Sequence, residues 1–338
     1  MKKINIHFVC RGNTYRSRLA SAYTATLASN KYRTSSSGIG PRMSKVQTVN
    51  TYTKTVADHH VLTFDIDTPR TQTTNELLRG ADVIVFMNQD VYLDAAKRFI
   101  FDDRKSVVWD VADIEEYALQ HGLPYNTDTQ LLKIAERGFQ KIRHLCDELY
   151  AYLSLTSWAD ITDEHNQLSG LRLPVNWAAD KGLWRRSCHI VITTTDRKFL
   201  VEKRSKNIVF SPSMIDISLG GGVDAGETPL QAAVRETKEE LGIELHPKDF
   251  RPLFIKKWST YHPHYKKYTK THSYVFHISI PLHSSDIQIQ KSEVEKVLLL
   301  SERQVMRLLR THYLKHIGRL VTGYAFYTRV IKQILLTN

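Results

Sequence analysis

One short stretch constrains the fold of this chain more than any other part of it. Residues 221–243 read GGVDAGETPLQAAVRETKEELGI, which predicts a loop followed by one helix. Thr228 is a favoured N-cap, Pro229 fits the first helical position, and Gln231 completes a capping box. Gly242 predicts the end of the helix, because glycine readily adopts the left-handed conformation found there.

The predicted helix has one apolar face and one acidic face. The side chains at apolar helical spacing, which we expect to be buried, are Leu230, Ala233, Val234, Thr237 and Leu241. Glu236, Glu239 and Glu240 stand at positions i, i+3 and i+4, so we expect their carboxylates to converge on another face. Carboxylates this close repel one another unless a cation lies between them, and such oxygen ligands suit Mg²⁺ or Mn²⁺. The alternative is an acidic helix with a solvated face.

This stretch resembles the Nudix box, G-x5-E-x7-R-E-U-x-E-E-x-G-U, where U is an apolar residue. The matching residues are Gly221, Glu227, Arg235, Glu236, Glu239, Glu240, Gly242 and Ile243. The one departure is Thr237, which stands at the first U position and should alter packing more than chemistry. The resemblance implies a metal-dependent hydrolase that directs water at a diphosphate linkage.

The resemblance also implies roles for individual residues of the box. Glu236, Glu239 and Glu240 hold Mg²⁺ or Mn²⁺, and Glu239 is counted among the catalytic residues. Glu227 and Arg235 support these ligands, with Arg235 paired to Glu239 one helical turn away.

Three residues outside the box are weaker candidates for the same site. The general base is left open between a box glutamate and a residue elsewhere, such as Glu293 or Glu295. A solvated turn is the favoured interpretation of the segment that holds those two residues. Arg204 is a phosphate contact by resemblance, with a surface salt bridge as the equal alternative.

Residues 160–166 and 184–192 resemble the start of the Nudix branch that includes isopentenyl diphosphate isomerase. The isomerases place a catalytic cysteine just before the box, where this chain has Asp216, Ile217 and Ser218. We therefore expect hydrolysis of a diphosphate and not isomerisation.

A second phosphate-binding motif begins at Cys10. Residues 4–9 predict a buried strand, and residues 10–17 read CRGNTYRS before a helix expected to reach about Ser29. A strand, a tight loop and a helix N-terminus form an anion site, because backbone N–H groups and the helix dipole supply positive potential. This field favours the thiolate of Cys10 as a nucleophile. Arg16 can hold two phosphate oxygens, and Ser17 can hydrogen-bond the sulfur.

The C-x5-R-S pattern resembles the low-molecular-weight protein tyrosine phosphatases, and the likeness extends to residues 36–38 and to the apolar strand 81–87. It implies that Cys10, Arg16 and Ser17 are catalytic and that this domain needs no cofactor. The residues implied to bind phosphate are Arg11, Gly12, Asn13, Thr14, Tyr15 and Arg16. Asn13 is further expected to hold the shape of the loop. A cysteine considered without its neighbours would more often be a core residue.

The family's general acid is an aspartate near the end of the domain, and Asp113 fits best, with Asp110 as the fallback. Such a residue protonates the leaving oxygen and then activates water. The alternative is a solvated loop carboxylate. Ile114 stands where the family has proline, and Tyr15 stands where many members carry a second cysteine. We therefore expect this domain to hydrolyse phosphomonoesters, but the two departures argue against assigning it a specificity for tyrosine phosphate.

The length of 338 residues predicts two domains. Residues 1–154 are expected to form a parallel α/β phosphatase sheet with flanking helices. Residues 155–338 are expected to form an α/β/α Nudix sandwich with a helical segment over 301–336. A helix is predicted over 129–153, with Cys146 in the core, and Cys188 is expected to be a packing residue in a strand.

Composition bears on partners and location. The net charge of +12 suits phosphorylated small molecules, a phosphoprotein, a diphosphate-containing metabolite or nucleic acid. Residues 256–272 interleave basic and aromatic side chains, which suits nucleic acid, although a strand hairpin is favoured. Three cysteines without metal-ligand spacing indicate a reducing cytoplasm, and no apolar run is long enough for a membrane span. The apolar stripe in 301–336 indicates core packing or a homodimer contact.

These features predict a bifunctional hydrolase, with cysteine-dependent phosphomonoester hydrolysis in the first domain and metal-dependent hydrolysis of a nucleoside-diphosphate-type or other diphosphate in the second. The alternatives are that one domain, more readily the first, is a non-catalytic phosphate-sensing or binding module, or that the protein binds nucleic acid.

Overall fold

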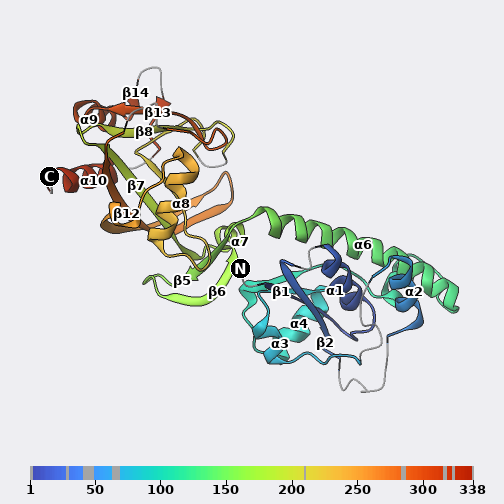
Figure 1. The fold of residues 1–338 in the computed structure, drawn as a ribbon. Coiled ribbons are helices and arrows are strands. Elements are labelled where there is room, and N and C mark those ends of the chain that lie inside the picture. The colour runs from blue at the N-terminus through green and yellow to red at the C-terminus, as the bar shows by residue number, and fades with distance from the viewer. Residues whose placement is uncertain are drawn as a thin grey trace. The chain divides into compact units, whose positions relative to one another are not determined.

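The computed structural model describes residues 3–27, 30–40, 49–62, 69–208, 211–282, 287–314, 318–321 and 324–336. The chain forms two compact units, Met1–Thr156 and Ser157–Asn338, whose elements are labelled in Figure 1. The sequence predicts the boundary at 154–155.

A four-stranded parallel sheet with the order β2-β1-β3-β4 is the centre of the first unit. Its strands are β1 (Ile4–Cys10), β2 (Tyr32–Gly38), β3 (Val83–Phe86) and β4 (Ser106–Val108). Its helices are α1 (Arg16–Leu27), α2 (Thr51–His59), α3 (Asn75–Gly80), α4 (Gln89–Arg98), α5 (Ile114–Gln120) and α6 (Asp128–Leu155). The fold class predicted for this part of the chain is confirmed.

The carboxyl ends of these parallel strands meet at one edge of the sheet. Cys10 at the end of β1 pairs with Gly38 at the end of β2. The backbone N–H of Met87, just after β3, donates to the carbonyl of Val9 at 2.9 Å, and that of Val111 donates to the carbonyl of Met87 at 2.8 Å. The loops that follow β1, β3 and β4 are therefore neighbours, which is where parallel sheets place ligands.

The long helix α6 closes the first unit. Thr127 and Gln130 form a capping box at its start, and the helix buries Phe139, Ile142 and Cys146. The prediction that Cys146 is a core residue is confirmed, and burial raises the pKa of its thiol to about 12.

A nine-stranded mixed sheet is the centre of the second unit. Its strands are β5 (Trp158–Thr162), β6 (Leu168–Pro174), β7 (Trp184–Thr194), β8 (Phe199–Arg204), β9 (Ile215–Asp216), β10 (Leu219–Gly222), β11 (Arg251–His262), β12 (Lys267–Ile280) and β13 (Val294–Leu300). Strands β11 and β12 form an antiparallel hairpin, which confirms the hairpin predicted over 256–272. Strand β12 also runs parallel to β7 at the middle of the sheet.

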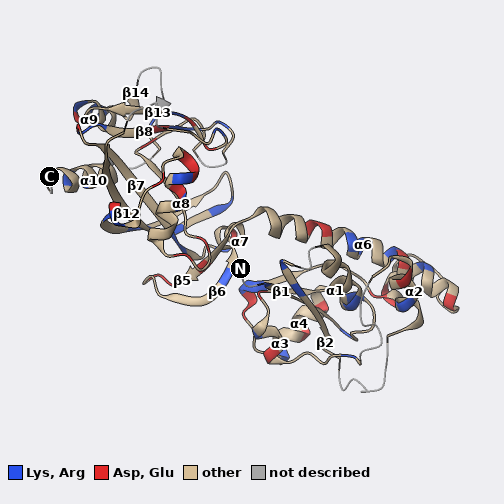
Figure 2. Ribbon diagram, viewed as in Figure 1, with Lys and Arg blue, Asp and Glu red and all other residues tan. Residues whose placement is uncertain are grey.

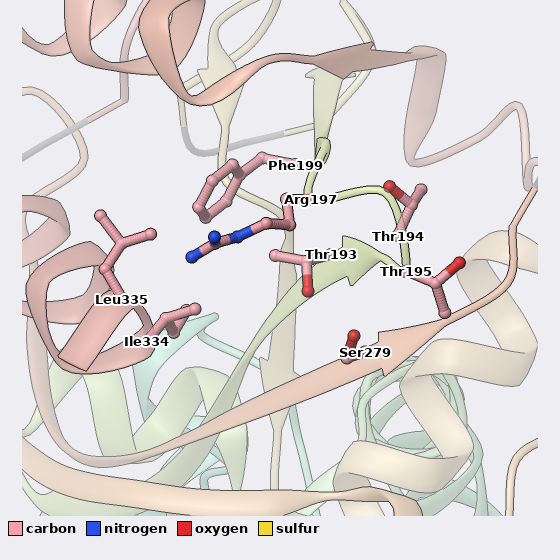
Figure 3. A pocket seen from close by; sticks show the side chains of 8 residues that line it. All are labelled: Thr193, Thr194, Thr195, Arg197, Phe199, Ser279, Ile334 and Leu335. Atoms are coloured by element: carbon pink, nitrogen blue, oxygen red, sulfur yellow. The ribbon is translucent and has the colours of Figure 1, made fainter. Parts of the chain in front are cut away.

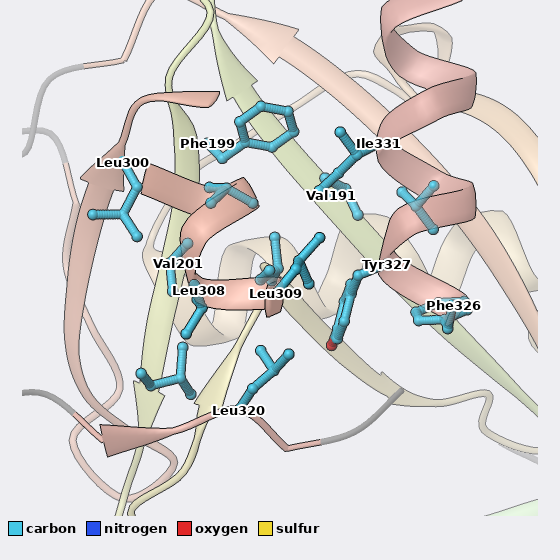
Figure 4. Close-up of a cluster of buried hydrophobic side chains, with 14 of the residues drawn as sticks. Val191, Phe199, Val201, Leu300, Leu308, Leu309, Leu320, Phe326, Tyr327 and Ile331 are labelled. Atoms are coloured by element: carbon cyan, nitrogen blue, oxygen red, sulfur yellow. The ribbon is translucent and has the colours of Figure 1, made fainter. Parts of the chain in front are cut away.

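Helices cover both faces of this sheet, because side chains alternate along each strand. On β7, Cys188 and Ile190 belong to a core under helix α8 (Pro229–Leu241), together with Ala233 of that helix. Val191, which follows Ile190 on β7 and points the other way, belongs to the opposite core (Figure 4). That second core is closed by α9 (Glu302–Thr311) and α10 (Tyr324–Leu336). A shorter helix, α7 (Val175–Asp180), packs against β5, β6 and β12.

The helical segment predicted over 301–336 is formed by two separate helices. Helix α9 ends at Thr311, and His312 adopts a left-handed conformation with φ of 53°. A two-stranded ribbon, β14 (Tyr313–Leu314) and β15 (Gly318–Arg319), separates α9 from α10. The apolar stripe is therefore divided between two helices that pack on the same core. Ile317 of the predicted stripe lies outside the described residues.

Candidate active sites

The loop after β1 surrounds the sulfur of Cys10 with polar groups. Cys10 is buried, and its Sγ lies 3.0 Å from Oγ of Ser17. The backbone N–H of Asn13 donates to the same sulfur at 3.1 Å. Helix α1 starts at Arg16, so its N-terminus follows the loop directly. The structure thus brings together Cys10, Asn13 and Ser17, as the spacing predicts.

Asn13 holds this loop against the neighbouring segments. Its Nδ2 donates to Oγ of Ser17 at 3.1 Å and to Oγ of Ser36 at 3.0 Å, and its Oδ1 accepts the backbone N–H of Thr71 at 2.8 Å. The residue is fully buried and has a φ of 50°. Asparagine tolerates this left-handed region better than most side chains, so both its conformation and its bonds suit it to the position.

Arg16 is buried and reaches from α1 to the loop after β4. Its Nη1 donates to the carbonyl of Val111 at 2.8 Å, and its Nη2 lies 3.4 Å from Oδ2 of Asp113. Asp113 also caps α5, because its Oδ1 accepts the backbone N–H of Glu116 at 3.1 Å. Asp110 instead is almost fully exposed and pairs with Lys141 at 3.2 Å. The geometry therefore favours Asp113 over Asp110.

The other predicted phosphate-binding residues belong to the same loop. Arg11 is exposed and lies 3.6 Å from Asp94, and Gly12 and Thr14 are partly buried. Tyr15 is buried and directs its hydroxyl away from the sulfur, since it donates to the carbonyl of Ala135 at 2.6 Å. Burial raises the pKa of Tyr15 far above its usual value. Of Tyr15, only the backbone is thus suited to bind phosphate.

A buried polar network behind the loop was not predicted. His7 on β1 lies 2.7 Å from the hydroxyls of both Ser35 and Ser37 through its two ring nitrogens. Ser37 Oγ lies 2.7 Å from Thr73 Oγ1, and the carbonyl of Ser37 accepts from Ser17 at 3.4 Å. Burial lowers the pKa of His7 to about 4, so the imidazole is neutral. A histidine inside an apolar strand was the only sequence signal for this network.

Gly38 leaves room for the same loop. A Cβ atom at this position would lie 2.8 Å from the carbonyl oxygen of Arg11 and 2.8 Å from the backbone nitrogen of Asn13. Backbone atoms cannot move aside as a side-chain end can, so only glycine allows this approach.

The second candidate site lies on α8, whose predicted ends are confirmed. Thr228 and Gln231 form the capping box, Pro229 is the first helical residue, and Gly242 closes the helix with φ of 70°. Thr237 is buried and donates to the carbonyl of Ala233 at 2.8 Å, so it fills the core as expected.

Arg235 is the centre of an ion-pair network on α8. Its guanidinium binds both oxygens of Glu227, at 2.9 and 3.0 Å. Its Nη1 lies 3.1 Å from Oε2 of Glu239, the predicted pair, and 2.8 Å from Oε1 of Glu236. Figure 2 shows acidic and basic positions adjoining along this helix. Glu227 and Arg235 therefore fix the start of the box and two of its glutamates.

That Glu236, Glu239 and Glu240 hold a cation stays a prediction, and the structure shows what each of them contacts without one. Glu236 and Glu239 converge on Arg235, which already supplies the positive charge, and Glu239 is exposed. Glu240 is buried one helical turn after Glu236, which contributes to raising its pKa. Across the described ranges, no three His, Cys, Asp or Glu side chains form a ready-made metal site.

Glu202 on β8 is the buried neighbour of Glu240, and it was not predicted. Glu202 contributes to raising the pKa of Glu240, and Oε2 of Glu202 is buried without a hydrogen-bond partner among the described residues. Burial, and then each group's acidic neighbours, raise the pKa values of both above the usual range for glutamate. Asp216 pairs with Glu202 across β8 and β9 and accepts from the hydroxyl of Tyr327. The available signal was a charged residue inside the apolar strand that begins at Phe199.

The remaining predicted candidates differ in how near they lie to the buried carboxyl groups of Glu202 and Glu240. Arg204 lies 3.7 Å from Glu202 and 3.9 Å from Asp216. Glu293 adds to the negative potential that raises the pKa of Glu240, whereas Glu295 pairs with Lys203 at 2.7 Å. Cys188 is buried, and burial raises the pKa of its thiol to about 12.

The donor set fits a hard divalent cation. Burial raises the pKa of Glu236 to about 7, and Glu240 and Glu202 are buried carboxyls with raised pKa values, so a nearby cation would stabilise their ionised forms. Gly221 makes room for Glu236, because a Cβ atom there would lie 2.0 Å from its Oε1. Mg²⁺ commonly takes only one or two carboxylates and completes its shell with water and substrate phosphates.

A cavity of about 280 Å³ lies elsewhere in the second unit, between the β7–β8 turn and α10 (Figure 3). Its lining residues are Thr193, Thr194, Thr195, Arg197, Phe199, Ser279, Ile334 and Leu335. None of the predicted site residues lines it. Among the helices in the described ranges, none combines the length and apolar character that crossing a bilayer requires.

The chain thus forms two α/β units, each with one candidate site. Residues 5–157 match the low molecular weight phosphotyrosine protein phosphatase family, and residues 183–318 match the NUDIX domain family. The first match thus coincides closely with the first unit, and the second match lies within the second unit. The narrower likeness to the isopentenyl diphosphate isomerase branch stays a prediction.

Individual proteins resemble one unit each. The uncharacterized Nudix hydrolase YfcD of Salmonella typhi is 37% identical over 91 residues, which are 27% of this chain and 49% of that protein. The chain thus spans about half the length of this curated relative. The structure of DR0079 from Deinococcus radiodurans is 19% identical with a TM-score of 0.39, and the match covers 52% of this chain and 98% of that one. The low molecular weight protein tyrosine phosphatase from T. tengcongensis is 18% identical with a TM-score of 0.37, covering 44% and 99%.

Proposed function

We propose that the first unit hydrolyses phosphomonoesters through a phosphocysteine and that the second hydrolyses a diphosphate linkage with Mg²⁺ or Mn²⁺. The observation that carries the first half is the placement of Arg16 beside both the Cys10 loop and Asp113. The observation that carries the second is the set of buried carboxyl groups formed by Glu236 and Glu240 on the box helix and Glu202 on β8.

In the first unit, the thiolate of Cys10 attacks phosphorus while the bond to the leaving oxygen breaks. Asp113 gives its proton to that oxygen. Arg16 and the backbone N–H groups of the loop hold the phosphoryl oxygens, and Ser17 stabilises the sulfur through the contact of 3.0 Å. Asp113, now ionised, takes a proton from water, which attacks phosphorus and releases phosphate and the thiolate.

In the second unit, a bound divalent ion would supply charge neutralisation at the phosphoryl oxygens and a more acidic water. Glu236, Glu239 and Glu240 would hold the ion, and Glu236 and Glu240 would have to lose their protons to do so, because burial raises their pKa values. Arg235 orients Glu236 and Glu239 through contacts of 2.8 and 3.1 Å. The result is one phosphomonoester from each side of the cleaved linkage.

This product chemistry links the two proposed activities. Hydrolysis of a diphosphate ester yields phosphomonoesters, which are the substrate class of the first unit. The two units are therefore suited to act in series on one substrate, and two unrelated substrate profiles would argue against it.

A screen of phosphate and diphosphate metabolites with three proteins tests the proposal. Wild type, Cys10→Ser and Glu239→Gln would be compared with and without Mg²⁺. We expect Cys10→Ser to abolish nitrophenyl phosphate hydrolysis and to retain diphosphate hydrolysis, and Glu239→Gln to do the reverse. Wild type that binds phosphate but never turns over nitrophenyl phosphate would make the first unit a binding module.

A further inference from the structure

The hairpin of β11 and β12 carries positive charge that no acidic residue of its own balances. Residues 250–285 contain Arg251 and five lysines, and they contain no aspartate or glutamate. Pairing of β12 with β7 begins at Thr271, so the end of the hairpin over 259–270 extends past the start of that pairing. A projecting element with charge of one sign favours an anionic partner.

Aromatic and basic side chains share one face of this hairpin. Tyr261 pairs with Tyr268 across the two strands, and their ring centres lie 4.7 Å apart. Lys270 follows two residues after Tyr268 and therefore points to the same side. Lys257 and Lys270 both lie over the ring of Trp184, with Nζ 4.8 and 5.9 Å from its centre. We call these five residues, Tyr261, Tyr268, Lys270, Lys257 and Trp184, the hairpin strip.

The two tyrosine rings of the hairpin strip are accessible. Tyr261 is 47% exposed and Tyr268 is 36% exposed. Nζ of Lys270 lies 5.6 Å from the centre of the Tyr268 ring, and two residues along a strand span roughly 7 Å. An exposed ring beside an ammonium group can therefore stack a base and contact the adjoining phosphate of the same strand.

The lysines of the hairpin strip differ in how far their charge is already balanced. Lys257 lies 3.8 Å from Oε2 of Glu164, which is a long ion pair. Lys270 contacts the rings of Trp184 and Tyr268 and forms no ion pair with a described residue. Its charge is thus the most available to a phosphate.

The opposite face of the hairpin provides a control. Lys256 is the neighbour of Lys257 on β11 and points to that other face, where its Nζ lies 5.1 Å from the ring centre of Trp258. Trp258 in turn packs on Phe326 of α10, with ring centres 5.4 Å apart. This face therefore continues into the core instead of presenting open rings.

We propose that the hairpin strip binds single-stranded nucleic acid, with unpaired bases stacked on Tyr261 and Tyr268 and phosphates held by Lys257 and Lys270. A duplex buries the faces of its bases and cannot stack on the rings in this way. The binding is a further function of the second unit and is independent of the two proposed hydrolytic activities.

Fluorescence anisotropy with a labelled oligo(U) of about 10 nucleotides tests the proposal. The full chain would be titrated in EDTA at several salt concentrations. We expect Tyr268→Phe to bind as wild type does, because the ring remains, and Tyr268→Leu to bind roughly tenfold more weakly. Lys270→Met should lower the slope of log affinity against log salt by about 0.7, as for loss of one phosphate contact on a single strand. Lys256→Met should keep the wild-type slope.

Thermal unfolding of the same variants separates binding from structure. Tyr268→Leu keeps an apolar side chain beside Tyr261, and should it still lower Tm, the slope measured with Lys270→Met decides the question. Absence of binding by wild type, full affinity in Tyr268→Leu, or equal slopes in Lys270→Met and Lys256→Met would overturn the proposal.

Two further comparisons exclude other kinds of binding. Heparin or a duplex bound as tightly as oligo(U) would make the hairpin strip a general polyanion surface and would overturn the proposal. Cys10→Ser and Glu239→Gln should bind oligo(U) as wild type does, and loss of binding in either would place the nucleic acid in a hydrolytic site instead.

Discussion

Oδ2 of Asp113 lies 3.4 Å from Nη2 of Arg16, while Oδ1 of the same carboxyl accepts the backbone N–H of Glu116 at 3.1 Å. One oxygen therefore faces the phosphate-binding arginine, and the other fixes the N-terminus of α5. Because the two roles use different atoms, a substitution can remove one and keep the other.

Asp113→Asn should separate acid catalysis from capping. Asparagine caps helices about as well as aspartate, so Tm should stay close to wild type. Loss of the proton donor should lower kcat for phenyl phosphate roughly 10²–10⁴-fold. Nitrophenyl phosphate should be affected less, because its leaving group departs without a proton. Steady-state kinetics on both esters measure the difference.

Two further variants control that experiment. Asp110→Asn should leave both rates unchanged, since Asp110 is exposed and contacts only Lys141 among the described partners. Asp113→Ala should lose the cap as well and unfold about 1 kcal/mol more easily. Wild-type turnover of phenyl phosphate by Asp113→Asn would remove Asp113 from the mechanism.

Asn13 combines a left-handed conformation with three side-chain bonds. Asn13→Ala loses the bonds and keeps the strain, whereas Asn13→Gly loses the bonds and relieves it. Both variants should lower kcat/KM for nitrophenyl phosphate by a similar factor. Asn13→Ala should be less stable than Asn13→Gly by about 1 kcal/mol of unfolding free energy, and so should have the lower Tm. Full activity in Asn13→Gly would show that conformation, and not the bonding, is what the loop requires.

His7 should make the first unit sensitive to acid. Its pKa falls from 6.5 to about 4 on folding, so the unfolded chain binds its proton first as pH decreases. The contribution of neutral His7 to the unfolding free energy is present in full above pH 6.5. It is lost as the pH falls from 6.5 to 4, and the loss is about 2 kcal/mol at pH 4.5. His7→Gln can keep a hydrogen bond but cannot titrate. Chemical unfolding at pH 7 and pH 4.5 should show the smaller loss in His7→Gln, and equal losses would contradict the assignment.

Features set by neighbouring residues could be predicted from the sequence. Thr228, Pro229 and Gly242 determine the ends of α8 through interactions within one turn. The Arg235–Glu239 pair follows from helical spacing alone. The loop from Cys10 to Ser17 is equally local, which is why its contacts match the motif.

Features set by strand order could not be predicted. Glu202 meets Glu240 only because β8 passes under α8, and the sequence does not reveal which strand lies there. His7 meets Ser37 only through the register of β1 with β2. The ribbon after Thr311 was missed because apolar residues at helical spacing continue through it.

Gly221 and Gly222 offer a matched test of the metal site. A Cβ atom at Gly221 would lie 2.0 Å from the Glu236 carboxylate, whereas one at Gly222 would meet no atom within 4 Å. Gly221→Ala should displace the Glu236 carboxylate, a flexible side-chain end, and weaken Mg²⁺ binding roughly 10–100-fold, as for loss of support to a metal ligand. The rise in Tm on adding Mg²⁺ measures this, because a ligand that binds only the folded state stabilises it. Gly222→Ala should respond as wild type does. Equal Mg²⁺ responses in the two variants would exclude Glu236 as a ligand.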